Sequence, residues 1–259
     1  MSYYPVFMQL GDRTCAVFGG GTVATEKVEG LLRAGARVRL IGEPITGTLE
    51  RLAEDGRVRH ERRGYRPGDL AGVFLAISEP QGGGIDEQIA AEARERNVPL
   101  NVVDVPLLCS FIAPSVARRG DLVVAVSTSG KAPALAVRIR EAIERQIGPH
   151  HARFLEFAGR LRGPLAHHYP DLATRKRLWY RLVDSDVVPL LEAGNDEAAI
   201  ARISEIVALP RATFGAPPGG AGCRPGSAAA PDARPSPSSA VATDSSRSPG
   251  SAAASDAGP

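Results

Sequence analysis

A glycine-rich turn near the start of the chain has the spacing of a dinucleotide-binding loop. Gly19, Gly21 and Ala24 fit the pattern G-x-G-x-x-[GA], and the apolar residues 14–18 precede them. The first glycine permits a tight turn, the second lets a pyrophosphate approach the backbone, and the small third residue lets a helix pack on the strand. Unpaired N–H groups at the start of that helix attract phosphate. The cofactor contacts predicted in this turn are Gly19, Gly20, Gly21, Thr22 and Val23.

Two further loops are expected at the same edge of the sheet, residues 42–44 and 78–84. Glu43 lies roughly 20 residues beyond the glycines, where an acidic side chain can bind a ribose 2′-hydroxyl. A surface glutamate that happens to precede a proline explains this residue equally well. No cluster of Arg or Lys is present to bind a 2′-phosphate, so NAD is favoured over NADP. Pro44 and Ser78 complete the predicted cofactor contacts.

A candidate acid–base residue follows the apolar stretch 98–103. Asp104 ends this stretch, and Pro106 prevents the strand from continuing. A carboxylate at the cofactor edge can accept a proton from a substrate while hydride leaves to a nicotinamide. Many aspartates at strand ends cap a turn instead, so the residues alone leave both roles open.

A polar loop before a long helix has the composition of an anion site. Ser127, Thr128, Ser129 and Lys131 surround a glycine and precede a helix that begins near Pro133. The loop is no Walker P-loop, because the upstream glycine is missing and Ala132 follows the lysine. Capping of the helix by the hydroxyl groups is the alternative, and both roles are compatible.

The five histidines do not predict a metal site. Four of them form two adjacent pairs, and neighbours in a helix point in different directions. No histidine partner follows at the i+4 spacing that zinc sites on helices use. They are interpreted as surface residues: His60, His150, His151, His167 and His168.

Alternating apolar strands and amphipathic helices in the first half predict a doubly wound α/β domain of Rossmann type with a parallel sheet. The expected strands are residues 14–18, 37–41, 58–61, 73–77 and 98–103. The expected helices follow the glycine turn up to Gly35 and then cover residues 45–54 and 85–96. Such a sheet would bring the glycine turn and Asp104 to one edge.

The pattern changes after Pro106. Residues 115–119 and 122–127 predict a hairpin, 133–147 a long helix, and 150–209 only helices, with Asp171 and Asn195 as N-caps. The expected domains are an NAD-binding domain at 1–112, a dimerisation segment at 113–148 and a helical domain at 149–213. Because the middle segment is too small to hold its own core, a homodimer is expected. The Pro/Ala/Ser/Gly-rich residues 214–259 predict a disordered tail.

Composition limits the class of protein. The 259 residues carry a net charge of +2, which argues against nucleic acid as the main partner. No apolar run has the length of a membrane span, and the first residues show no basic region followed by an apolar core, so no signal peptide is expected. The three cysteines form no C-x-x-C motif and suit a reducing cytosol. A cytoplasmic protein without a membrane partner is expected.

Five blocks in this order resemble the precorrin-2 dehydrogenase/sirohydrochlorin ferrochelatase module of siroheme synthase. They are YPVF at 4–7, VFGGGTVATEK at 17–27, NVVD at 101–104, SFIAPS at 110–115 and VAVSTSGKAPALA at 124–136. The resemblance extends over about residues 3–209, and the ordered series is far more specific than any single block.

The resemblance implies NAD-dependent oxidation of precorrin-2 to sirohydrochlorin, with ferrous iron as a further substrate if the chain also makes siroheme. It implies that Asp104 is the catalytic group. It further implies that Arg118 and Arg119, with the loop 127–131, bind the carboxylates of the tetrapyrrole. The fused enzymes continue into a methyltransferase domain, which this sequence does not show. Residues 76–84 depart from the family's Ala-Thr-Asp-Asp-like turn, which leaves a non-catalytic dinucleotide- or tetrapyrrole-binding sensor as the alternative.

Overall fold

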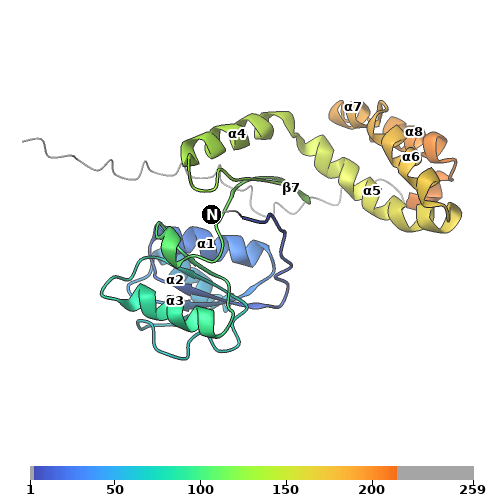
Figure 1. Ribbon diagram of the computed structural model, residues 1–259. Helices are drawn as coiled ribbons and strands as arrows, with labels where there is room; N and C mark the ends of the chain where they lie inside the picture. Colours follow the sequence, from blue (N-terminus) through green and yellow to red (C-terminus); the bar gives the residue numbers. More distant parts are fainter. Residues whose placement is uncertain (1–2, 215–259) are drawn as a thin grey trace, which may run out of the picture. The chain divides into compact units, whose positions relative to one another are not determined.

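The structure, a computed structural model, describes residues 3–214 and begins with a five-stranded parallel sheet (Figure 1). The strand order is β3-β2-β1-β4-β5, and every neighbouring pair is parallel. The order reverses between β1 and β4, and ligands of open α/β sheets bind at that point. The strands are β1 (Thr14–Phe18), β2 (Arg37–Ile41), β3 (Val58–Glu61), β4 (Leu75–Ser78) and β5 (Leu100–Val102).

Helices cover both faces of this sheet, as the predicted doubly wound fold requires. The helices are α1 (Thr22–Arg33), α2 (Gly47–Glu54) and α3 (Ile85–Glu95). One apolar cluster joins α1 and α2 to Cys15 and Val17 of β1, and the other joins α3 to Ala16 and Phe18. Alternate residues of β1 therefore enter opposite cores, and all four are buried.

Several predicted boundaries move by a few residues. The helix expected from residue 45 begins at Gly47, because the Thr46 side chain accepts a hydrogen bond from the N–H of Leu49 and caps it. The fourth strand begins at Leu75 and the fifth is confined to Leu100–Val102. Apolar composition overestimates these two strands because Val73 and Val98 are buried in the core while their N–H groups bond within the preceding turns, outside the sheet.

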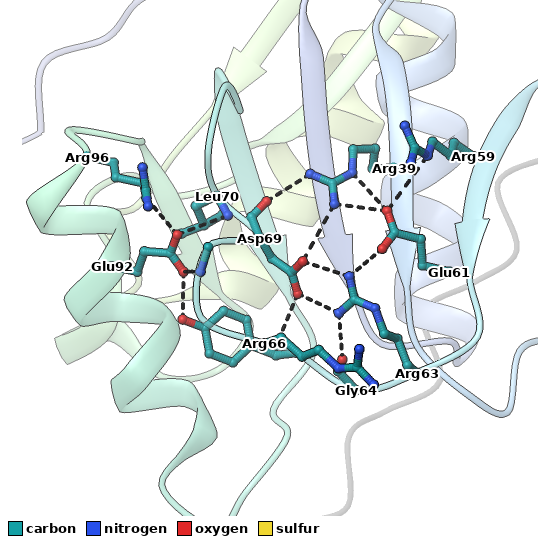
Figure 2. Close-up of polar contacts among 12 residues, drawn as sticks. Arg39, Arg59, Glu61, Arg63, Gly64, Arg66, Asp69, Leu70, Glu92 and Arg96 are labelled. Carbon is teal, nitrogen blue, oxygen red and sulfur yellow. Dashed lines mark hydrogen bonds and ion pairs between the residues drawn. The ribbon is translucent and has the colours of Figure 1, made fainter.

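The connection between β3 and β4 contains no helix and is held to the sheet by charged groups (Figure 2). Arg63 donates to both carboxylate oxygens of Asp69 at 2.7 Å and also contacts Glu61. Arg39, which projects from β2, bonds Glu61 at 2.9 Å and the carbonyl oxygen of Asp69 at 2.9 Å. The buried Glu92 of α3 fixes the rest of the connection by accepting from the hydroxyl of Tyr65 at 2.7 Å.

These ion pairs perturb two acids. Burial raises the pKa of Glu61, but hydrogen bonds and positive charge from Arg39 and Arg63 outweigh it, so the pKa lies below its ordinary value. The pKa of Asp69 is lowered in the same way: its burial acts upward, and Arg63, the N–H of Arg66 and Arg39 act downward more strongly. Both groups are therefore carboxylates in the folded state near neutral pH.

The predicted hairpin and long helix follow. β6 (Ser115–Arg119) pairs antiparallel with β7 (Leu122–Val126), and α4 (Pro133–Gln146) packs on both strands. Two apolar side chains of α4 remain exposed: Leu135 is 53% exposed and Ile139 is 39% exposed.

The last described part is helical, as predicted. It comprises α5 (Pro149–His168), α6 (Leu172–Val183), α7 (Val187–Glu192), α8 (Asp196–Val207) and the short 3-10 turn Arg211–Phe214. Asp171 caps α6 by accepting from the N–H groups of Ala173 and Thr174, and Asn195 caps α8. Phe214 is 2% exposed in this helical core, so the predicted tail begins one residue too early. The rest of that tail lies outside the described residues.

None of the helices within residues 3–214 combines the length and the apolar character that a bilayer crossing requires.

Candidate active site

The carboxyl ends of β1, β4 and β5 form one row, which brings the predicted loops to a single edge. Phe18 lies opposite Ser78, and Ser78 lies opposite Val102. One residue further on, the N–H of Glu79 donates to the carbonyl oxygen of Phe18 at 2.8 Å. The N–H of Val103 likewise donates to the carbonyl oxygen of Ser78 at 2.9 Å. With strands spaced at about 4.8 Å, the end of β5 lies about 10 Å from the glycine turn across the sheet.

Two glycines of the turn are required, one by its backbone conformation and the other by a close contact. Gly19 has φ +118°, a conformation that side chains rarely adopt. A Cβ on Gly20 would lie 2.1 Å from the carbonyl oxygen of Pro44, so only glycine fits against the loop after β2. A hydrogen bond of 2.8 Å between the hydroxyls of Thr25 and Thr46 further joins the two loops.

The Glu79 carboxylate occupies the N–H donors of the glycine turn. Its Oε2 accepts from the N–H of Gly20 at 3.0 Å and of Gly21 at 2.9 Å, and its Oε1 accepts from Ala24 at 2.8 Å. The glycine pattern predicts that a pyrophosphate approaches the backbone at Gly21, whereas in this structure the Glu79 side chain from the end of β4 lies there. A Cβ at Gly21 would lie 2.9 Å from Glu79 Oε1.

This contact tests whether the turn suits an anionic cofactor. The three N–H groups converge on two carboxylate oxygens at the first turn of α1, which has no acidic residue and no side-chain cap of its own. The donor set therefore fits a pair of phosphate oxygens, since both groups are anionic acceptors attracted by the positive end of a helix. A pyrophosphate can use the same donors only after the Glu79 side chain has left them.

The other predicted cofactor residues are at the same edge but make different contacts. Glu43 and Pro44 are exposed in the loop that touches Gly20. Ser78 is fully buried, and its hydroxyl donates to the carbonyl oxygen of Glu79 at 2.8 Å. Ser78 therefore fixes the backbone of the Glu79 loop. No contact of Thr22 or Val23 tests their predicted role.

Asp104 lies in a turn directly after β5. Its backbone is left-handed, with φ +60°, and its side chain is exposed. Within residues 3–214 no hydrogen bond or ion pair is formed by its carboxylate, so the turn-capping interpretation receives no support from the structure. A carboxylate that is fixed by its backbone and free at its oxygens can accept a proton from a bound molecule.

Cys109 holds the turn that carries Asp104, a role that the sequence pattern did not reveal. Its sulfur accepts from the N–H of Val102 at 3.2 Å and lies 3.1 Å from the carbonyl oxygen of Val102 and 3.3 Å from that of Val105. Burial raises the pKa of this thiol, which keeps it protonated and able to donate. The residues on both sides of Asp104 are thus tied to one side chain.

The predicted anion loop uses its hydroxyls internally. The Ser127 hydroxyl accepts from the N–H of Ser129 at 3.0 Å, and the Thr128 hydroxyl accepts from the N–H of Ala132 at 3.2 Å. These bonds hold the loop itself and do not cap α4, which has no side-chain cap at its N-cap residue Ala132, so the capping alternative is not confirmed. The exposed Lys131 is the cation of the loop.

Arg118 and Arg119 lie at the other end of the hairpin from this loop. Arg119 pairs with Leu122 beside the turn, whereas Ser115 pairs with Val126, directly before Ser127. Arg119 donates to the carbonyl oxygens of Arg118 and Glu144. The two predicted groups of anion-binding residues therefore do not form one site within a single chain.

The histidines serve different local roles. The His60 Nε2 lies 2.9 Å from the carbonyl oxygen of Gly42, and the His151 Nδ1 accepts from the N–H of Gly148 at 3.1 Å. In the part of the chain that the structure describes, no three His, Cys, Asp or Glu side chains gather as metal ligands would.

Three protein families match successive parts of the chain. Residues 6–115 match a family described as putative NAD(P)-binding. Residues 119–146 match the central region of sirohaem biosynthesis proteins, and residues 150–206 match the sirohaem synthase dimerisation region.

Curated relatives share the same part of the chain. The siroheme synthase of Methylobacillus flagellatus is 36% identical over 199 residues, which cover 77% of this chain and 43% of the relative. The siroheme synthase of Photobacterium profundum is 37% identical over 199 residues, covering 77% of this chain and 42% of the relative. The chain thus spans less than half the length of these relatives.

A solved structure, SirC, a precorrin-2 dehydrogenase, has a similar fold. It matches with a TM-score of 0.61 at 21% identity and covers 78% of this chain and all of the SirC chain. The order of the three matched regions and the identity to siroheme synthases confirm the resemblance that the sequence blocks predicted: the chain is similar to the part of siroheme synthases that joins an NAD(P)-binding domain to a dimerisation region.

Proposed function

We propose that this chain oxidises precorrin-2 to sirohydrochlorin with NAD⁺. The observation that carries the proposal is the unbonded carboxylate of Asp104 at the same sheet edge as the glycine turn. Bound NAD⁺ would supply the acceptor of a hydride. Loss of a hydride and a proton together removes two electrons and two hydrogens from the substrate, which balances the oxidation. Asp104 accepts the proton, and its fixed backbone keeps the carboxylate at the edge where the hydride leaves.

The parts after residue 112 serve to bind the substrate and a second copy. We assign residues 113–148 to a dimerisation segment and residues 149–214 to a helical domain. The partly exposed Leu135 and Ile139 on α4 form an apolar surface that a second chain can cover. Lys131 from one chain, with Arg118 and Arg119 from the other, can contact the carboxylates of the tetrapyrrole, since one chain alone separates these groups.

The test is the formation of NADH from precorrin-2 and NAD⁺, followed at the absorbance of NADH and of sirohydrochlorin. Asp104→Asn is the informative variant, because asparagine tolerates the left-handed backbone at φ +60° while it cannot accept the proton. We expect it to bind NAD⁺ normally and to lose about 100-fold or more in kcat. Full activity of Asp104→Asn would refute the assignment.

Insertion of ferrous iron into sirohydrochlorin is a second prediction of the family resemblance. Here iron is a substrate, and Asp104 could also accept the pyrrole protons that the metal displaces. Incubation of the protein with sirohydrochlorin and Fe²⁺ tests this step independently of NAD⁺.

A non-catalytic dinucleotide sensor is the competing function, and the observation in its favour is the departure of the loop after β4 from the turn expected of a dehydrogenase of this type. Such a sensor would bind NAD⁺ in calorimetry and produce no NADH with precorrin-2.

A further inference from the structure

We propose that Glu79 is an internal competitor of the dinucleotide: its carboxylate must leave the glycine turn before the pyrophosphate can bind, and Glu79 thereby sets the affinity for NAD⁺. The inference rests on the proposed function, because it concerns the cofactor that this function uses. It follows from the position of one side chain, which contacts all three N–H groups that converge at the start of α1.

The contact is the kind that phosphate makes. Both oxygens of the carboxylate are used, at distances between 2.8 and 3.0 Å, and the donors belong to the glycine pattern of the turn itself. Charge-assisted bonds from backbone N–H groups to an anion are among the stronger hydrogen bonds in proteins. The hydrogen bonds from these N–H groups to Glu79 thus stabilise the free protein. The pyrophosphate of NAD⁺ has to displace the carboxylate before it can accept the same bonds.

Only the side chain of Glu79 has to move, because its main chain is held by hydrogen bonds. The backbone N–H of Glu79 donates to the carbonyl oxygen of Phe18 at 2.8 Å. The backbone carbonyl oxygen of Glu79 accepts from the Ser78 hydroxyl at 2.8 Å and from the Gln81 side chain at 2.7 Å. Pro80 follows and restricts the backbone further. Because the main chain is fixed on both sides, rotation of the glutamate side chain opens the turn and leaves the sheet edge intact.

The remaining loop is already ordered without that carboxylate. Asp86, at the first turn of α3, accepts from the N–H of Gln81 and of Gly82. Residues 80–84 therefore have their own support, and displacement of the Glu79 side chain need not unfold them. This separates the competitor role from a role in holding the loop.

A purely structural role for Glu79 predicts a different result. If the carboxylate only caps α1, its removal lowers stability and leaves the affinity for NAD⁺ unchanged or weaker. If it competes, its removal lowers the stability of the free protein and strengthens the binding of NAD⁺. The two readouts then move in opposite directions, which a cap alone cannot produce.

The experiment is calorimetric titration of the full chain and of Glu79→Ala and Glu79→Gln with NAD⁺, ADP-ribose and adenosine, alongside thermal unfolding without ligand. Glu87→Gln is the matched control, because Glu87 is an exposed acid in the first turn of α3, close in sequence to Glu79. If about nine molecules in ten hold the carboxylate in the turn, emptying it lowers the dissociation constant of NAD⁺ and ADP-ribose about tenfold. Adenosine has no phosphate, and its affinity should not change.

The outcomes separate this inference from the proposed function. Tighter NAD⁺ binding by both Glu79 variants, with the control unchanged, supports the inference. Detectable NAD⁺ binding by the Glu79 variants but not by the wild type or the control also supports it. Equal or weaker NAD⁺ binding by the variants overturns it and leaves the dehydrogenase proposal intact. Absence of NAD⁺ binding in every protein overturns both.

Discussion

Replacement of Asp69 by asparagine should lower the free energy of unfolding, because ion pairs hold the helix-free β3–β4 connection against the sheet. The Asp69 side chain is 8% exposed and bonds both terminal nitrogens of Arg63 at 2.7 Å. It also accepts from the N–H of Arg66 at 2.8 Å and lies 3.6 Å from the guanidinium of Arg39. Asparagine keeps the size and one acceptor oxygen but removes the charge that both guanidinium groups face.

The expected loss in the free energy of unfolding is about 2 kcal/mol. Breaking a buried pair costs about 3 to 5 kcal/mol, because the partner charge is left in a poor environment. Arg63 and Arg39 retain 22% and 20% side-chain exposure, so water screens part of that loss. Urea unfolding measures the change as a shift of the midpoint at constant slope.

Asp12→Asn is the control. Asp12 pairs with Arg37 at 3.0 Å, but both side chains are at least 70% exposed, and such a pair contributes less than about 1 kcal/mol. If the Asp69 variant unfolds at the same urea concentration as the Asp12 variant, the buried network does not stabilise the connection and the reasoning is wrong.

The network also predicts an acid dependence. The folded pKa values of Asp69 and Glu61 lie below their ordinary values, so their contribution is complete above the unfolded values of about 4 and is lost as pH falls through the folded ones. Wild-type stability should therefore fall below about pH 4, and Asp69→Asn should fall less steeply over the same range.

Three other perturbations test separate parts of the chain. Cys109→Ala removes the sulfur that bonds the backbone on both sides of Asp104, so kcat for NADH formation should fall about tenfold with little change in the KM for NAD⁺. An unchanged kcat would mean that the turn keeps its conformation without these bonds. Leu135→Arg combined with Ile139→Arg should convert a dimer into monomers in analytical ultracentrifugation, since both are exposed apolar residues of α4; persistence of the dimer would place the interface elsewhere. Gly20→Ala should lower the midpoint of thermal unfolding, because its Cβ would meet the carbonyl oxygen of Pro44 at 2.1 Å; Gly64→Ala, with open space around it, is the comparison.

The sheet and its cofactor edge could be predicted from the sequence because local patterns determine them. Val17 and its neighbours form a run that is apolar at every position, as a strand covered on both faces requires. Gly19 marks the turn because its positive φ restricts the residue type. Asp171 and Asn195 were identifiable as caps because side-chain capping depends on residues two or three positions away.

The contacts that the sequence did not reveal join residues that are far apart along the chain or lie in irregular segments. Glu79 reaches donors 55 to 59 residues away, and the only signal was an acid directly after the strand at the switch point. The Arg63–Asp69 pair lies in a helix-free connection without periodicity. Arg118 and Ser127 are near each other in sequence, yet the hairpin sends them to opposite ends, which composition alone does not show.

The burial of Phe214 determines where the chain can be shortened. Its ring is a full member of the apolar cluster formed by α5, α6, α7 and α8, although it stands at the last described position. A protein cut at residue 210 would open a void among these helices at a cost of about 3 to 5 kcal/mol. One that ends immediately after the phenylalanine keeps the cluster filled, which makes it the better starting point for crystals.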